Sequence, residues 1–315
     1  MILSEAIESL AVATLADGRS ERTAGDYRQK LGALLTFLGD RDVATITVDE
    51  LRRFVVGLRT RSSRYAGHPA RDELAGGLSP ASIAGYIRAL KRLFAWLVEE
   101  GVTVSNPARR IKTPKIARGE PKAYHADDFP KLLEATAGDE PVQLRDRALL
   151  LFLADTGCRA GGAAGLRLGD LDFGGNTARV IEKGEKTRRV PFSEPTAAAL
   201  QAWLAVRPQF EGNWLWVNMG RRGLAHLTAD GIGEVLRRMK KRAGIEGPCN
   251  PHSFRHGFAR EYLLAGGDLG TLADLLGHSD VQVTWQHYAI FRTAELAIKH
   301  DKHSPIARMG REGKL

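Results

Sequence analysis

Four segments beyond residue 150 contain arginine, lysine, histidine and tyrosine side chains, which together can bind and cleave a phosphodiester. The segments are ADTGCRAGGAAGLRLGDLD (154–172), VIEKGEKTRRVPF (180–192), NPHSFRHGFAREYL (250–263) and LLGHSDVQVTWQHY (275–288). Guanidinium groups bind anionic oxygens, a tyrosine hydroxyl can attack phosphorus, and histidine or lysine can transfer the protons that this attack requires. The chemistry indicated is transfer of a phosphoryl group to a protein side chain.

Each segment alone is typical of ordinary structure. A His-x-x-Arg pair, such as His252 and Arg255, is usually a surface or capping feature of a helix, and a lysine beside a hairpin turn is usually solvated. A tyrosine at a helix end commonly belongs to an amphipathic core, and Gly-His-Ser after two leucines is a common helix stop. Only the combination of segments can assign the chemistry.

In this order and at this spacing, the four segments resemble the catalytic domain of the tyrosine recombinases, the phage integrase family. Residues 20–112 resemble the helical core-binding domain of the same family, so the resemblance covers essentially the whole chain. It implies a mainly α fold, with an all-helical N-terminal DNA-binding domain and a mainly helical catalytic domain that contains a small antiparallel β-sheet. The residues that match the family's catalytic positions are Arg159, Lys183, His252, Arg255, His278 and Tyr288.

The resemblance assigns Arg159 and Arg255 to the scissile phosphate, and elementary chemistry supports that role. Attack on phosphorus builds negative charge on the non-bridging oxygens, and two arginines can hold these oxygens with forked cations whose charge does not titrate. His278 is expected to donate a further hydrogen bond to the phosphate.

The same resemblance makes Tyr288 the nucleophile, His252 the base that assists it and Lys183 the acid. A tyrosine hydroxyl has a pKa of about 10, so it needs a nearby base and a cationic field to attack at neutral pH. The departing 5′-oxygen needs a proton, which a lysine on a hairpin beside the DNA can deliver. No step requires a metal ion or another cofactor, and we expect none.

Gly162 departs from the family's pattern. Family members usually carry an acidic residue three places after the first arginine, where it braces neighbouring groups of the active site, and this chain has glycine there. The resemblance implies that the segment after Arg159 is helical, and glycine costs a helix about 1 kcal/mol relative to alanine. We therefore expect Gly162→Ala to be tolerated and slightly stabilising.

The elements that must position these residues follow from length and local pattern. A chain of 315 residues exceeds what one core usually holds, which favours two domains. The first domain, predicted at 1–110, contains helix-start signals followed by apolar residues at helical spacing. The signals are Thr23 with Asp26, Thr47 with Glu50, and Ser79 with Pro80. Gly101 closes the last helix, and residues 59–78 are predicted to form a loop.

A basic stretch at 111–124 is predicted to be a linker, because it contains prolines and lacks apolar periodicity. In the catalytic domain, 125–315, strands at 178–181 and 188–192 flank KGEK, a hairpin signal with glycine in the turn. Helices are predicted at about 126–137, 144–156, 196–206, 228–243, 253–265 and 269–276. A further short helix is expected at 294–299, in a C-terminal tail that commonly links neighbouring protomers in this family.

Composition constrains the partners and the compartment. The net charge of +9 suggests an anionic partner, which the resemblance identifies as double-stranded DNA with specific recombination sites, bound by a homo-tetrameric synapse. A basic run at 237–242 either lies along a phosphate backbone or forms a solvated face. Two cysteines form no disulfide framework, and no apolar run approaches the roughly 18 residues of a membrane helix, so we expect a cytoplasmic protein without membrane contact. The residues identify neither the DNA site nor accessory proteins.

Two other functions share part of this pattern. A type IB topoisomerase uses similar side chains, but the separate helical N-terminal domain, the short chain and GHSDVQVTWQHY favour a recombinase. A DNA-binding relative with a decayed active site would account for Gly162, but all six catalytic positions are filled. The sequence predicts a site-specific recombinase or integrase that works through a 3′-phosphotyrosyl intermediate and a Holliday junction.

Overall fold

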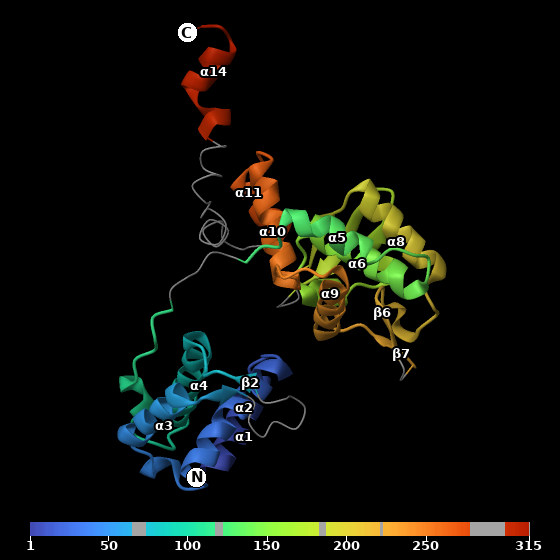
Figure 1. Cartoon of the computed structure of the whole chain (residues 1–315). Helices are drawn as coiled ribbons and strands as arrows, with labels where there is room; N and C mark the ends of the chain where they lie inside the picture. Colours follow the sequence, from blue (N-terminus) through green and yellow to red (C-terminus); the bar gives the residue numbers. More distant parts are fainter. Residues whose placement is uncertain (65–73, 117–121, 183–186, 221–222, 278–299, 315) are drawn as a thin grey trace. The chain divides into compact units, whose positions relative to one another are not determined.

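The computed structural model of the chain describes residues 1–64, 74–116, 122–182, 187–220, 223–277 and 300–314 (Figure 1). The chain divides into two compact units, Met1–Arg118 and Gly119–Leu315. Each unit has its own apolar core. No helix in the described ranges is long and apolar enough to cross a membrane.

The first unit packs its helices around a single core. Its elements are α1 (Leu3–Ala16), α2 (Glu21–Leu38), α3 (Val48–Thr60) and α4 (Pro80–Glu99), with 3-10 turns η1 (Val43–Thr45) and η2 (Pro107–Arg110). One fully or almost fully buried side chain from each helix illustrates the shared core: Leu10, Leu34, Phe54 and Phe94. The core lies between the helices, as expected when amphipathic helices bury their apolar faces against one another.

Side-chain caps set where these helices begin. At α3, the Glu50 N–H donates to Thr47 Oγ1 (3.3 Å) and the Thr47 N–H donates to Glu50 Oε2 (2.9 Å), which confirms the predicted capping box. Ser79 caps α4 as predicted. The start predicted at Thr23 was wrong, because the hydroxyl of Ser20 accepts the Thr23 N–H (3.3 Å) and α2 therefore begins earlier.

Two features of the first unit were not predicted. Helix α1 packs against α2 and α4. The stretch predicted as a loop at 59–78 includes a short antiparallel ladder between β1 (Ser63–Arg64) and β2 (Leu74–Ala75).

The ends of the stretch predicted as a linker, 111–124, are packed. Ile111 belongs to the first core, and the Tyr124 ring lies 5.0 Å from the Phe254 ring of the second unit.

The second unit is mainly helical in its described residues and carries small antiparallel sheets. Its helices are α5 (Phe129–Glu134), α6 (Pro141–Thr156), α7 (Ala160–Ala164), α8 (Glu194–Val206), α9 (Ala229–Ala243), α10 (Pro251–Leu264), α11 (Leu269–Leu276) and α14 (Pro305–Arg311). Its 3-10 turns are η3 (Ala126–Asp128), η4 (Leu168–Asp170) and η5 (Glu211–Asn213). Its strands are β3 (Leu171–Asp172), β4 (Thr177–Ile181), β5 (Thr187–Pro191), β6 (Val217–Gly220) and β7 (Gly223–His226).

Most of the predicted elements of this unit are confirmed. The hairpin is present, with β4 and β5 antiparallel and Ala178 opposite Val190, and β3 adds a third strand on the other side of β4. The helices predicted from 144 to 276 correspond to α6, α8, α9, α10 and α11. The helix predicted at 126–137 is shorter than expected and consists of η3 and α5. The helix predicted at 294–299 lies outside the described residues.

Helix α6 provides the centre of the second core. Its residues Leu149, Phe152 and Leu153 are fully buried, and α8 and α10 pack against it. A smaller apolar cluster, separate from this core, joins α10 to α11. Its buried members are Ala259, Leu263, Leu272 and Leu276.

Candidate active site

The candidate site begins where α6 ends. Gly157 ends this helix in the left-handed conformation (φ 57°), and a Cβ added to it would lie 2.6 Å from Cδ1 of Phe258. Glycine is therefore required both by the backbone and by the close approach of α10. The turn directs Cys158 into the core and places Arg159 at the N-terminal end of α7.

Arg255 comes from α10, whose first turn is fixed by Asn250, since the side-chain oxygen of Asn250 accepts the Ser253 N–H (3.0 Å). The Arg255 residue is only 4% exposed. Its Nη1 donates to the Gly157 carbonyl (3.0 Å) and its Nη2 to the Leu276 carbonyl (2.7 Å). A buried guanidinium needs such partners, and these two carbonyls tie α10 to the ends of α6 and α11.

Arg159 meets Arg255 at the same carbonyl oxygen. Its Nη1 donates to the carbonyl oxygen of Leu276 (3.5 Å), and Leu276 is the last residue of α11. The last carbonyls of a helix carry partial negative charge, which allows the two guanidinium groups to lie close together despite their like charge. Two predicted residues from distant parts of the sequence therefore converge.

Sequence reasoning missed two further charged residues of this cluster. Strand β4 buries Val180, and the alternation of side chains places Glu182, just after the strand, on the same side. Glu182 Oε2 accepts from Nη1 of Arg159, and Glu182 Oε1 accepts from Nη2 of Arg188 on β5 (3.0 Å). Arg188 also donates to the carbonyl of Leu275, so β5 is tied to the end of α11 as well.

We call Arg159, Glu182, Arg188 and Arg255 the arginine cluster. It combines three guanidinium groups with one carboxylate and so has a net positive charge beside the end of α11. The side chain of Arg159 is 37% exposed, against 14% for Arg188 and 8% for Glu182. An anion arriving from solvent would reach Arg159 first, with the other cations adding Coulomb attraction.

Three of the six predicted catalytic residues are described by the structure. His252 lies exposed on the first turn of α10, three residues before Arg255, so the two share a side of the helix. The other predicted residues lie outside the described ranges: Lys183, His278 and Tyr288.

The described chain nevertheless leads from the arginine cluster to these residues. Glu182 directly precedes Lys183 in the sequence, and Gly277 directly precedes His278. Gly277 is left-handed (φ 66°), and a Cβ added there would lie 2.8 Å from Cδ of Arg188. Both segments therefore depart from the same cluster of charges.

Gly162 has no room for a side chain. A Cβ added there would lie 2.5 Å from Cγ1 of Val180 and 3.2 Å from Sγ of Cys158, and both neighbours are fully buried. The packing of α7 against β4 argues against the expectation that alanine is tolerated at this position, which considered helix propensity alone. The same burial raises the pKa of the Cys158 thiol to about 12.

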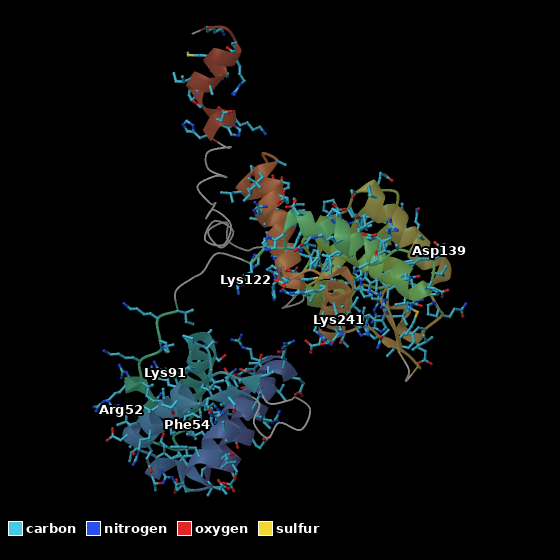
Figure 2. The ribbon with its side chains drawn as sticks, in the orientation of Figure 1. Arg52, Phe54, Lys91, Lys122, Asp139 and Lys241 are labelled. Atoms are coloured by element: carbon cyan, nitrogen blue, oxygen red, sulfur yellow. The ribbon has the colours of Figure 1, made fainter. Side chains whose placement is uncertain are left out.

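The basic run on α9 is partly occupied by contacts within the chain. Arg242 donates to the buried carboxylate of Asp146 (3.1 Å), and Arg237 donates to a glutamate one turn earlier (3.0 Å). Lys241, marked in Figure 2, lines a cavity together with Arg238. Phosphate contact by these two residues stays a prediction.

The chain matches known families over both units. Residues 122–294 match the model of the phage integrase family, and residues 12–101 match that of the phage integrase N-terminal SAM-like domain. The tyrosine recombinase XerD of Listeria monocytogenes is 35% identical over 221 residues, which cover 68% of this chain and 72% of that protein. The tyrosine recombinase XerC of Alcanivorax borkumensis is 31% identical over 295 residues, which cover 92% of this chain and 90% of that protein.

Solved structures share the fold. The XerH site-specific recombinase bound to a palindromic difH substrate aligns with a TM-score of 0.68 and 20% identity, over 91% of this chain and 81% of that one. The Tn1549 transposon integrase in complex with transposon right end DNA aligns with a TM-score of 0.69 and 18% identity, over 94% and 98%. The predicted fold class is confirmed. Matched by family models in both units and by relatives along nearly its whole length, the chain belongs to the phage integrase family of tyrosine recombinases.

Proposed function

We propose that this chain is a site-specific DNA recombinase that cuts and rejoins DNA through a covalent link to Tyr288. The tyrosine oxygen attacks the scissile phosphorus, the bond to the 5′-oxygen breaks, and the DNA 3′-phosphate becomes esterified to the tyrosine. A 5′-hydroxyl from a second DNA then attacks this ester, which releases Tyr288 and joins the new strand. Two such exchanges pass through a Holliday junction.

The observation that carries this proposal is the convergence of Arg159 and Arg255 on the carbonyl of Leu276. Two cations held at one point, one of them 37% exposed, suit the two non-bridging oxygens of a phosphodiester. Because their positions are fixed before the substrate arrives, they can stabilise the charge that develops as the tyrosine attacks. One residue separates Leu276 from His278, so the segment that carries Tyr288 starts at this point.

We assign the proton transfers to the remaining predicted residues. His252 is exposed and lies one helical turn from Arg255, which suits a base that accepts the proton of the Tyr288 hydroxyl. Lys183 follows directly on the carboxylate residue of the arginine cluster, and we assign to it the proton that the departing 5′-oxygen takes up. His278 donates a hydrogen bond to the phosphate.

The substrate in this proposal is double-stranded DNA with two specific sites, held by four copies of the chain. Helix α14 supports contacts between copies, since its Ile306 and Met309 are 62% and 40% exposed. Apolar side chains on a terminal helix are suited to a groove on a neighbouring protomer. An enzyme with this substrate is expected in the cytoplasm.

Trapping of the covalent intermediate tests the proposal. The DNA site is first selected from a random duplex library with the Tyr288→Phe variant, and a nicked version of that site then serves as a suicide substrate. The wild type should become attached to the DNA 3′-phosphate in a form that resists SDS, because the short 5′ fragment diffuses away. Tyr288→Phe should bind the same DNA without attachment.

Tyr262→Phe is the matched control, since it removes a tyrosine hydroxyl from α10 and leaves the nucleophile. It should attach to DNA as the wild type does. Attachment by Tyr288→Phe, or its loss in both variants, would contradict the assignment of the nucleophile.

A further inference from the structure

Glu182 is the carboxylate of the arginine cluster, and it takes no part in the proton transfers proposed above. Its side chain is 8% exposed, and its two oxygens accept from different arginines, Oε2 from Arg159 and Oε1 from Arg188. A carboxylate withdrawn from water requires cationic or hydrogen-bonding partners. Because each oxygen holds one guanidinium, the carboxylate restrains both arginines together.

The Arg159–Glu182–Arg188 bridge, in which one carboxylate joins two arginines, extends from the sheet to the end of α11. Arg188 donates to Glu182 (3.0 Å) and to the carbonyl of Leu275, while Arg159 donates to Glu182 and to the carbonyl of Leu276 (3.5 Å). Each arginine therefore spans from the carboxylate to one of two consecutive carbonyls. This paired arrangement leaves the Arg159 guanidinium few orientations.

The position of Glu182 also accounts for glycine at 162. A Cβ on residue 162 would lie 3.7 Å from Cγ of Glu182, so a carboxylate from either position reaches the same space beside Arg159. A side chain at position 162 would also meet Cγ1 of Val180 at 2.5 Å, so in this chain the carboxylate fits at 182 and not at 162.

We infer that Glu182 is a positioning residue that holds Arg159 in the orientation that binds the scissile phosphate, in place of the acidic residue usual at position 162. The inference rests on the proposed function, in which Arg159 touches the phosphate and Glu182 does not. A cation stabilises developing charge best when it is already oriented, so loss of the restraint lowers the rate of cleavage more than the affinity for DNA.

The test is a double-mutant cycle in the full-length chain between Glu182→Gln and Arg159→Lys. Attachment to the suicide substrate is measured in single turnover at saturating DNA, and DNA affinity is measured in the Tyr288→Phe background. Glutamine preserves size and removes the charge, so Glu182→Gln should slow attachment roughly tenfold with affinity changed less than about twofold. In the Arg159→Lys enzyme the same change should slow attachment less than about threefold, because its target is already lost.

Asp170→Asn is the matched control. The Asp170 side chain is 6% exposed and its carboxylate lies 2.7 Å from Nη2 of Arg179 on β4, so it is a similarly buried carboxylate in an ion pair, although Arg179 is 56% exposed. Asp170→Asn should lower the melting temperature while slowing attachment less than about twofold, and its effect should be independent of Arg159→Lys.

A second experiment moves the carboxylate from position 182 to position 162. Val180→Ala removes the methyl group that a side chain at 162 would meet. In the Val180→Ala, Glu182→Gly background, addition of Gly162→Glu should raise the attachment rate roughly tenfold. No gain, with melting temperature maintained, would show that the two positions are not equivalent and would overturn the inference.

Additive effects of Glu182→Gln and Arg159→Lys on the attachment rate would also overturn the inference. So would an attachment rate that falls as much in Asp170→Asn as in Glu182→Gln. Thermal unfolding of the same variants separates this failure from failure of the proposed function. Coupling of Glu182 and Arg159 in melting temperature, without any attachment by the wild type, would refute the proposed function and with it the catalytic role of the bridge. Attachment by the wild type without coupling in either measurement would refute the inference alone.

Discussion

Gly162→Ala should destabilise the second unit, although the same change in an open helix stabilises a protein. The added methyl would lie 2.5 Å from Cγ1 of Val180 and 3.2 Å from Sγ of Cys158, and real Cβ atoms essentially never come within 3.0 Å of a neighbour. The Val180 side chain, helix α7 or strand β4 must therefore shift.

Two effects of opposite sign set the magnitude. Alanine gains about 1 kcal/mol over glycine in a helix. Insertion of a methyl group into a filled core costs about 1–3 kcal/mol, and the upper part of that range applies because Val180 is β-branched, fully buried and on the central strand of its sheet. The net loss is about 1–2 kcal/mol, which lowers the melting temperature of a unit of this size by about 2–8 °C.

Calorimetry at neutral pH on the wild type, Gly162→Ala and Gly161→Ala measures this difference. Gly161 is the matched control, because it lies in the same short helix and no heavy atom comes within 4 Å of its added Cβ. Gly161→Ala should raise the melting temperature. In a Val180→Ala background, Gly162→Ala should lose most of its cost. A melting temperature for Gly162→Ala at or above that of the wild type would refute the packing argument.

Three further changes test the site and its surroundings. Lys183→Ala should slow cleavage of normal DNA, and a 5′-phosphorothiolate at the scissile position should largely restore the rate, since a thiolate leaves without a proton. Arg159→Ala should gain little from the same substrate, and equal rescue of the two variants would mean that the roles are wrongly divided. Gly157→Ala should lower the melting temperature further than Gly244→Ala, because both residues are left-handed (φ 57° and 62°) but an added Cβ meets Phe258 only at 157; similar melting temperatures would contradict this. Burial raises the pKa of Cys158 from its ordinary value of 9.0 to about 12, so above pH 9 the unfolded thiol loses its proton first and stability falls as the pH rises toward 12. Urea titrations at pH 8 and pH 10 should show a larger loss for the wild type than for Cys158→Ala, and equal losses would argue against this linkage.

Features of the fold with local causes were predictable from the sequence. The starts of α3 and α4 follow from Thr47 and Ser79, whose side chains cap backbone groups only three residues away. Helix α1 was missed because its buried side includes small or polar residues such as Ala6 and Thr14, which weaken the apolar periodicity. The β6–β7 hairpin was missed because VNMGRRGLAH shows no clear alternation of apolar and polar residues.

The candidate site was predictable only in part. The resemblance identified Arg159 and Arg255, and the structure brings them together, but no motif marks Glu182 or Arg188 as their partners. Those contacts depend on the packing of β4 and β5 against the ends of α6 and α11. One signal was available, since the side-chain alternation that buries Val180 turns Glu182 inward, and an inward carboxylate requires a cation. For Gly162, helix propensity and packing predict opposite signs, because the neighbour that an added methyl would meet belongs to another element.

The small apolar cluster that joins α10 to α11 has a consequence for local unfolding. Leu272 and Leu276 of α11 pack in this cluster and not in the main core, and the last two carbonyls of the helix are held by arginine side chains. An element held by so little apolar surface opens at a lower free-energy cost than the whole unit unfolds, so the amide hydrogens of α11 should exchange with solvent sooner than those of α6. Opening of α11 would release Arg159, Arg188 and Arg255 from the carbonyls of Leu275 and Leu276 in one event, while Arg255 keeps its bond to the Gly157 carbonyl. Docking of this helix and its contacts to three arginines of the charge cluster are thus governed by a single local equilibrium.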